Sequence, residues 1–97
     1  MEKISIITPS YNSGGFIKET ILSVINQSYP NWEMIIVDDC SSDNTLEIIQ
    51  ENIKDSRIKL IKNEVNRGAA VCRNIGLENS SGRFIAFIER WFRTYID

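Results

Sequence analysis

Two adjacent carboxylates are the feature of this chain that most suggests chemistry. Asp38 and Asp39 directly follow an apolar run, Met34–Val37. Side chains of consecutive residues point in different directions, so one carboxylate can hold the following loop while the other faces a ligand. A carboxylate in such a place can accept a hydrogen bond from a nucleobase N–H or a ribose hydroxyl. The alternative, which the spacing leaves open, is that Asp38 only caps the turn that follows it.

A second polar segment, Thr8–Asn12, closes the first apolar run of the chain. Pro9 has a fixed backbone angle φ and no N–H donor, so the chain leaves this run in a defined direction. Tyr11 then offers a flat ring that is suited to stacking on a nucleobase. Arg73, further along, is a basic residue on a predicted helix. A lone helical arginine is more often a surface partner of a carboxylate than a ligand contact, so both roles stay open for Arg73.

The residue inventory excludes several kinds of site. The chain has no histidine, which excludes a Ser-His-Asp triad, a Cys-His protease and histidine-ligated zinc. Cys40 and Cys72 cannot form a disulfide framework or a four-ligand metal site, and we expect both to be small, half-buried packing residues. Neither a glycine-rich dinucleotide fingerprint nor a phosphate-binding loop is present, which argues against classical NAD or ATP binding.

Composition is that of an ordinary globular domain. The 97 residues include 11 Lys+Arg and 13 Asp+Glu, a net charge of −2, with 42% hydrophobic residues. Such values argue against intrinsic disorder, and the scattered charges argue against a nucleic-acid partner. The length indicates one domain at most. No long apolar run and no signal-peptide pattern is present, so we expect a cytoplasmic protein, with peripheral membrane attachment left open.

Hydrophobic periodicity predicts alternating strands and helices that would position these polar residues. Strands are predicted at 4–8, 32–37, 58–61 and 83–88, and helices at 16–27, 45–53 and 69–79. Ser42 or Asp43 is expected to cap the second helix. Alternation of this kind predicts an α/β fold, a three-layer α/β/α arrangement around a mostly parallel sheet.

The predicted strands also define a core and a place for a ligand. The residues expected in the core are Ile6, Ile36, Val37, Ile85 and Phe87. Ligands of open parallel sheets bind outside the carboxyl ends of the strands, near the point where the strand order reverses. The two polar segments stand at two of these ends.

Three segments together resemble the family 2 glycosyltransferases, which are inverting enzymes of the GT-A fold. They are Ile6–Asn12, Ile36–Thr45 and Asn66–Gly76, and the similarity extends over residues 4–88. The resemblance implies that residues 1–88 form the Rossmann-like, nucleotide-sugar-binding half of such a domain. It also implies a nucleotide-activated sugar as donor, commonly a UDP-sugar, an acceptor that is unknown, and Mg²⁺ or Mn²⁺ bridging the diphosphate.

The resemblance also implies roles for particular residues. The segment from Thr8 through Pro9 to Tyr11 resembles the one that lines the nucleotide pocket, with Tyr11 against the base. Asp39 resembles the carboxylate that accepts from the base, with Asp38 beside it. Arg73 matches a basic residue on the nucleotide side of the pocket.

The resemblance ends at residue 89. Family members carry an Asp-x-Asp or Asp-Asp motif after this strand, where the present chain has Glu89 and Arg90. A divalent ion held by Glu89 alone would be bound poorly, so no metal ligand and no catalytic residue is assigned. A truncated or frameshifted gene would explain the atypical tail, 89–97. The tail places Trp91, Phe92, Tyr95 and Ile96 at helical spacing.

Three functions follow as expectations. The first is a glycosyltransferase-like domain of the hexosyltransferase type, inactive in this form because the acceptor base and the metal ligands are missing. The second is a non-catalytic module that binds uridine nucleotides weakly. The third is a structural fragment that associates through an unpaired sheet edge. We also expect a homo-oligomer, with the tail in or near the contact.

Overall fold

The computed structural model describes residues 1–89 and contains all seven predicted elements. In chain order they are β1 (Ile4–Ser10), α1 (Ile17–Asn26), β2 (Trp32–Asp38), α2 (Thr45–Asn52), β3 (Ile58–Lys62), α3 (Ala69–Glu78) and β4 (Phe84–Phe87). β1 is two residues longer than predicted and includes Pro9. The residue that pairs with β4 at this end is Ile7, whose carbonyl accepts from Ile88. The backbone nitrogen of Pro9, two residues later, also faces the β4 side, but the pairing of β1 with β4 has ended before it. The missing N–H of Pro9 therefore breaks no hydrogen bond between the strands.

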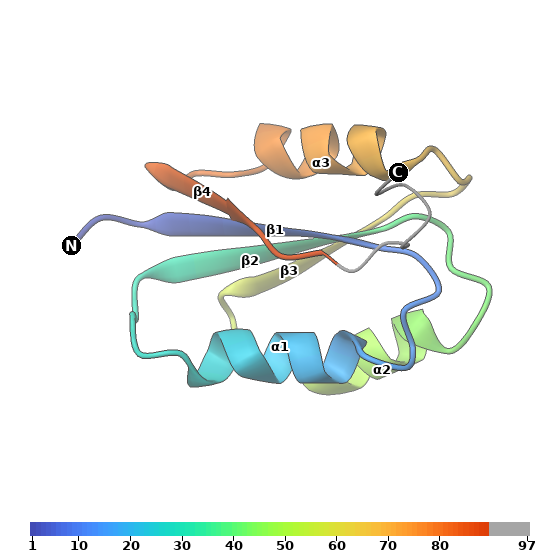
Figure 1. Ribbon diagram of the computed structural model, residues 1–97, viewed down its shortest axis with the longest axis horizontal. Helices are drawn as coiled ribbons and strands as arrows, with labels where there is room; N and C mark the ends of the chain where they lie inside the picture. Colours follow the sequence, from blue (N-terminus) through green and yellow to red (C-terminus); the bar gives the residue numbers. More distant parts are fainter. Residues whose placement is uncertain (90–97) are drawn as a thin grey trace.

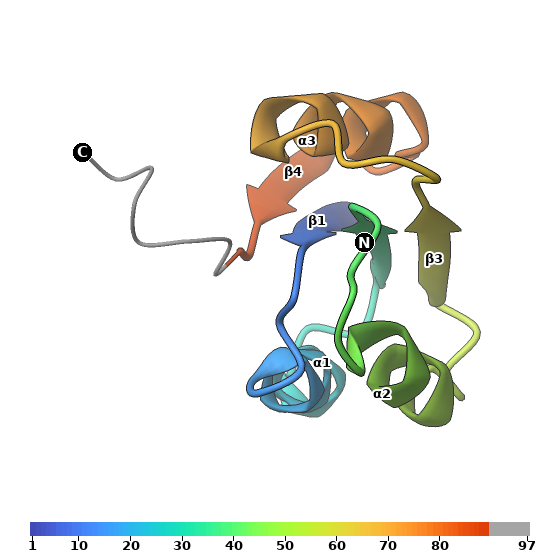
Figure 2. The same cartoon turned by 90° about the vertical axis from the view of Figure 1, so that its right-hand side faces the viewer.

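All four strands form one parallel sheet in the order β3-β2-β1-β4. The strand order reverses between β1 and β4, because β2 and β3 lie on one side of β1 and β4 on the other. Figure 2 shows this sheet nearly end-on, with β3 and β4 at its two edges. The predicted parallel sheet is confirmed.

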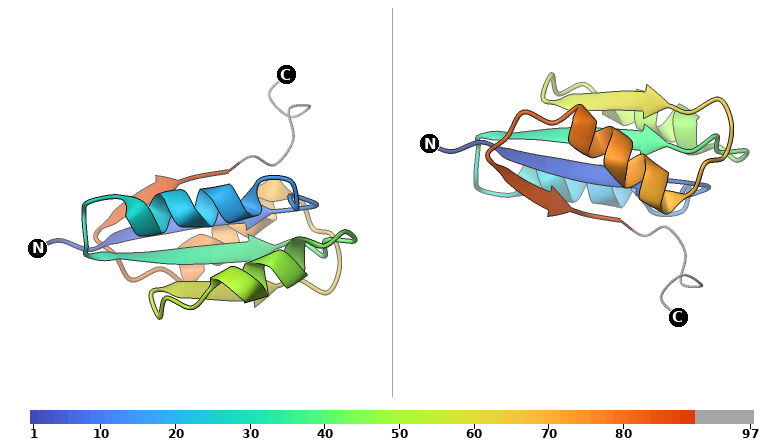
Figure 3. Two further views of the ribbon diagram at one scale, coloured as in Figure 1. Left: turned by 90° about the horizontal axis from the view of Figure 1, so that it is seen from below. Right: turned by 90° about the horizontal axis from the view of Figure 1, so that it is seen from above.

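Helices cover both faces of the sheet, which confirms the predicted three layers. Within residues 1–89, α1 and α2 lie side by side on one face, and α3 covers the other (Figures 1 and 3). α3 approaches β1 closely at Gly76, where an added Cβ would lie 2.5 Å from Cγ2 of Ile7. A glycine is required at this crossing because any side chain would push the helix away from the strand.

The core consists of one apolar cluster on each face of the sheet. Ile6 and Ile36 pack with α1 and α2, whereas Val37 packs with Ile35 and the buried Cys72 of α3. These placements confirm three of the predicted core residues and the packing role of Cys72. The prediction for Cys40 is wrong, because this residue is exposed in the loop after β2.

The predicted core positions on β4 are wrong. Ile85 is 38% exposed and Phe87 is 46% exposed. β4 is an edge strand with β1 as its neighbour, and α3 packs over β1 and β2 instead. Ile85 and Phe87 share one face of β4, whereas Ala86 and Ile88, on the other face, pack against the cluster that includes α1 and α2.

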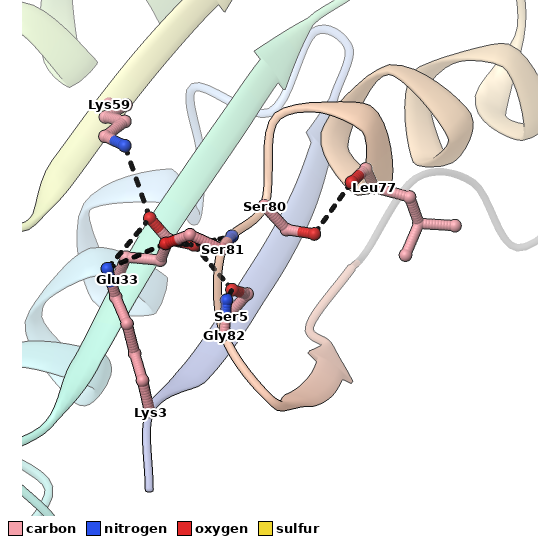
Figure 4. Close-up of polar contacts among 8 residues, drawn as sticks. All are labelled: Lys3, Ser5, Glu33, Lys59, Leu77, Ser80, Ser81 and Gly82. Carbon is pink, nitrogen blue, oxygen red and sulfur yellow. Dashed lines mark hydrogen bonds and ion pairs between the residues drawn. The ribbon is translucent and has the colours of Figure 1, made fainter.

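A buried glutamate that the sequence analysis did not single out ties β4 to the rest of the sheet (Figure 4). Glu33 of β2 is 2% exposed, and its Oε2 accepts from the Ser5 hydroxyl at 2.5 Å and the Ser81 backbone N–H at 2.6 Å. Its Oε1 lies 3.3 Å from Nζ of Lys59 and 3.5 Å from Nζ of Lys3. Burial alone would raise the pKa of Glu33, but these hydrogen bonds outweigh it and lower the pKa to about 2. The carboxylate therefore joins β1, β2, β3 and the loop before β4.

The helical spacing predicted for Trp91 to Ile96 lies outside the described residues. Among the helices of residues 1–89, none is long and apolar enough to span a membrane.

Candidate functional site

The loops that follow β1, β2 and β3 gather at the carboxyl end of the sheet, on the right in Figure 1. This is the end at which ligands bind in open parallel sheets. All six predicted site residues lie on or near this end: Thr8, Pro9, Tyr11, Asp38, Asp39 and Arg73.

Asp38 is the last residue of β2 and holds the turn that follows it. Its side chain is fully buried, Oδ2 accepts from the backbone N–H of Ser41 at 2.9 Å, and Oδ1 accepts from the Ser41 hydroxyl at 2.6 Å. Both carboxylate oxygens are therefore engaged by one residue. This geometry corresponds to the turn-capping alternative that the spacing left open.

Asp39 organises the loop between β3 and α3. Its fully buried carboxylate accepts from the side-chain amide of Asn63 at 2.9 Å and from the backbone N–H groups of Arg67 and Gly68, each at 2.9 Å. Gly68 has a φ of +96°, a conformation that glycine adopts without the strain a Cβ would bring. Asp39 thus joins the end of β2 to the beginning of α3.

These contacts determine the charge at the centre of the site. Burial alone would raise the pKa of Asp39, but the hydrogen bonds from Asn63, Arg67 and Gly68 outweigh it and lower the pKa below its usual 3.8. The neighbouring Cys72 thiol shows the opposite effect. Burial, together with the Asp39 charge, raises its pKa to about 12. The site therefore contains a carboxylate that is ionised at neutral pH and a thiol that stays protonated.

Arg73 forms an ion pair with Glu89 across the space between α3 and the end of β4. Nε of Arg73 lies 2.7 Å from Oε2, and Nη2 lies 3.0 Å from Oε1, so the pair is bidentate. The two side chains are 31% and 15% exposed. A partner carboxylate was one of the two roles expected for Arg73, and the structure supplies that partner from the position where the resemblance ends.

Side chains at the end of β1 point to both faces of the sheet. Tyr11 is half-buried and packs against the cluster of Val37 and Cys72 on the α3 side. Thr8 shares the opposite face with Ile6, because side chains alternate along a strand, and its buried hydroxyl has no hydrogen-bond partner in the described part of the chain. Pro9 is buried between them in the strand.

Asn12 and Ser41 belong to the site although sequence reasoning did not single them out. Asn12 has a positive φ of 47°, and its backbone N–H donates to the Ser41 hydroxyl at 2.9 Å. Its side-chain oxygen accepts from the backbone N–H of Ser42 at 2.8 Å. The available signal was the residue type, because asparagine tolerates the left-handed region and readily bonds to nearby backbone in turns.

The described residues do not fit a divalent cation. Within residues 1–89, no group of three or more Cys, Asp or Glu side chains converges in a way that could hold one. Asp38 and Asp39 use their oxygens on loop donors, and Glu89 is paired with Arg73. A hard divalent cation such as magnesium needs several oxygen ligands, which these residues do not bring together.

Known proteins provide an independent comparison. Residues 5–89 match the sequence model of the family described as Glycosyl transferase family 2. A relative from Escherichia coli, the UDP-Glc:alpha-D-GlcNAc-diphosphoundecaprenol beta-1,3-glucosyltransferase WfgD, is 52% identical over 86 residues. The match covers 89% of the present chain and 34% of that relative. The chain thus spans about a third of this relative's length.

Solved structures agree with this comparison. The crystal structure of S. aureus TarS in complex with UDP-GlcNAc matches with a TM-score of 0.84 and 36% identity, covering 90% of this chain and 26% of that one. The mannosyltransferase PcManGT from Pyrobaculum calidifontis, in complex with GDP-Man and Mn²⁺, matches with a TM-score of 0.84 and 26% identity. That match covers 91% of this chain and 27% of PcManGT.

Proposed function

The chain belongs to glycosyl transferase family 2, and on this premise we propose that residues 1–88 form the part of a hexosyltransferase that binds a nucleotide-activated sugar, with a UDP-sugar as donor. The observation that carries the proposal is the position of Asp39 at the carboxyl end of the sheet, where its carboxylate accepts from the loop after β3 and its backbone N–H donates to the carbonyl of Ser10 at the end of β1. The matched structure of TarS holds UDP-GlcNAc, and the name of WfgD gives it a UDP-glucose donor.

Tyr11, Asp39 and Arg73 would make the principal nucleotide contacts. Tyr11 lies on the α3 side of the sheet with its ring partly accessible, which suits stacking on the base. The Asp39 carboxylate accepts from Asn63, from Gly68 and with both oxygens from the Arg67 N–H, so a base N–H would bind there in exchange for one of these loop donors. The Arg73 guanidinium, now held by Glu89, would meet the uracil carbonyl or the ribose-phosphate side of the ligand.

We expect binding without glycosyl transfer from residues 1–89 alone. Inverting transfer needs a base to deprotonate the acceptor and a positive charge to neutralise the leaving diphosphate. Both carboxylates at the centre of the described site are engaged by loop hydrogen bonds, and Glu89 faces an arginine. Residues outside this region would have to supply the metal ligands and the base for transfer.

One observation favours the structural alternative as a second candidate. Phe84, Ile85 and Phe87 are 53%, 38% and 46% exposed on the β4 edge of the sheet. An exposed apolar edge strand can pair with another chain, so self-association along β4 is a second candidate beside nucleotide binding at the carboxyl end of the sheet. Sedimentation at increasing concentration tests this candidate, and a strictly monomeric chain at high micromolar concentration would exclude it.

Calorimetric titration with UDP, with and without Mn²⁺, tests the principal proposal. Asp39→Asn should weaken UDP binding about tenfold or more, because a charge-assisted hydrogen bond is removed from a buried site. Asp55→Asn is the matched control, since Asp55 pairs with Arg57 in the loop before β3, at the other end of the sheet. Absence of UDP binding by the unmodified chain, or equal affinity of the two variants, would contradict the proposal.

A further inference from the structure

We infer that Asp38, Ser41 and Asn12 form a clasp that positions the Tyr11 ring for the nucleotide, and that Asp38 itself is a positioning residue without ligand contact. This inference rests on the proposed nucleotide-binding function. It assigns to the first carboxylate of the pair a role different from that of the second. We call these three residues the loop clasp.

Ser41 is the centre of the loop clasp. Its hydroxyl donates to Oδ1 of Asp38 at 2.6 Å and accepts from the backbone N–H of Asn12 at 2.9 Å. Its own backbone N–H donates to Oδ2 of Asp38 at 2.9 Å. A single hydroxyl therefore links the end of β2 to the loop after β1, with a charged acceptor on one side and a backbone donor on the other.

Asn12 strengthens this link from the opposite direction. Its side-chain oxygen accepts from the backbone N–H groups of Ser42 at 2.8 Å and Asp43 at 3.3 Å. The carboxylate of Asp43 in turn accepts from the backbone N–H of Gly14 at 3.2 Å. The two loops are thus joined by hydrogen bonds in both directions over a short stretch of each.

The hydrogen bonds of Asp38 are directed to the loop clasp and not to the α3 side of the sheet, where Tyr11 packs. The side chain is fully buried and both oxygens bond to Ser41. Asp39 differs because its partners lie on the loop before α3, on the side where Tyr11 packs. Adjacent carboxylates therefore stabilise two different loops, one on each side of the β2 end.

The consequence for binding follows from the position of Tyr11. This residue directly precedes Asn12 and packs on the α3 side against Val37 and Cys72. With the backbone of Asn12 held in the left-handed region by the loop clasp, the direction of the preceding residue is defined. Loss of the clasp would lower the fraction of molecules whose Tyr11 is placed for stacking, and the apparent affinity falls in proportion to that fraction.

Two neighbouring serines provide a matched test. Ser41→Ala removes the hydroxyl that links Asp38 to Asn12, whereas Ser42→Ala removes an exposed hydroxyl that lies 3.4 Å from the Asn12 oxygen and leaves the Ser42 backbone N–H in place. UDP affinity of the full chain is measured by calorimetry for both, after thermal melting has shown that each is folded. We expect Ser41→Ala to weaken UDP binding about fivefold, Ser42→Ala to change it less than twofold, and Ser41→Thr to restore it.

A second readout separates positioning from simple stability. The ring resonances of Tyr11 should shift or broaden in Ser41→Ala and remain as in the unmodified chain in Ser42→Ala and Ser41→Thr. If the unmodified chain does not bind UDP, the proposed function fails, and the inference fails with it. If the chain binds UDP and Ser41→Ala binds equally well, or if Tyr11 resonances are unchanged, the loop clasp is refuted while the proposed function stands.

Discussion

The buried carboxylate of Glu33 should make the stability of this domain depend strongly on pH. Its pKa is lowered from 4.5 to about 2, because hydrogen bonds outweigh the effect of burial. At about 1.4 kcal/mol for each pH unit, the ionised form contributes about 3 kcal/mol to the free energy of unfolding. A lowered pKa means that this contribution is fully present above pH 4.5 and is lost as the pH falls toward 2.

Glu33→Gln tests this reasoning directly, since the amide has nearly the shape of the protonated carboxyl but cannot ionise. We expect the variant to be about 3 kcal/mol less stable at pH 7, which lowers the urea midpoint by about 1–3 M. The difference from the unmodified chain should shrink to about 1 kcal/mol at pH 3, because the unmodified chain has by then lost most of the contribution.

Urea melts followed by circular dichroism at several pH values measure both quantities. Glu51→Gln, at an exposed glutamate of α2, is the control and should follow the unmodified chain at every pH. If Glu33→Gln and the unmodified chain gave parallel stability curves between pH 7 and pH 3, the carboxylate would not be the group that carries the effect. Hydrogen exchange should also show earlier opening of β4, because Ser81 loses its charged acceptor.

Three further expectations concern packing and reactivity. In the folded chain a thiol reagent should label the exposed Cys40 rapidly. The buried Cys72, whose pKa is about 12, should be labelled only on unfolding, and equal labelling rates would contradict its burial. Ile36→Ala should lower the free energy of unfolding by about 2–5 kcal/mol in denaturant melts, and a loss below about 0.5 kcal/mol would contradict its place in the core. Gly76→Ala should destabilise by about 1–3 kcal/mol despite the better helix propensity of alanine, because its methyl would lie 2.5 Å from Ile7; a more stable variant would show that α3 can move aside.

Local pattern was sufficient for the secondary structure of this chain. The apolar runs of β1 and β2 and the helical spacing of α1 are short-range signals, and Gly, Pro and Asp mark their ends. The parallel sheet then follows from the alternation of strand and helix. The exposure of the Ile85 and Phe87 side chains could not be predicted in this way. Burial on β4 depends on which helices and strands of the folded chain pack beside it.

The sequence by itself determined which residues meet at the carboxyl end of the sheet, because the ends of parallel strands lie together whatever the loops do. Only the tertiary structure decided how their functional groups are used. The donors to Asp39 come from Asn63, Arg67 and Gly68, more than twenty residues away along the chain, and the partner of Arg73 is Glu89. Residue type states that a carboxylate can accept hydrogen bonds, but the number of donors that surround it is a property of the folded chain.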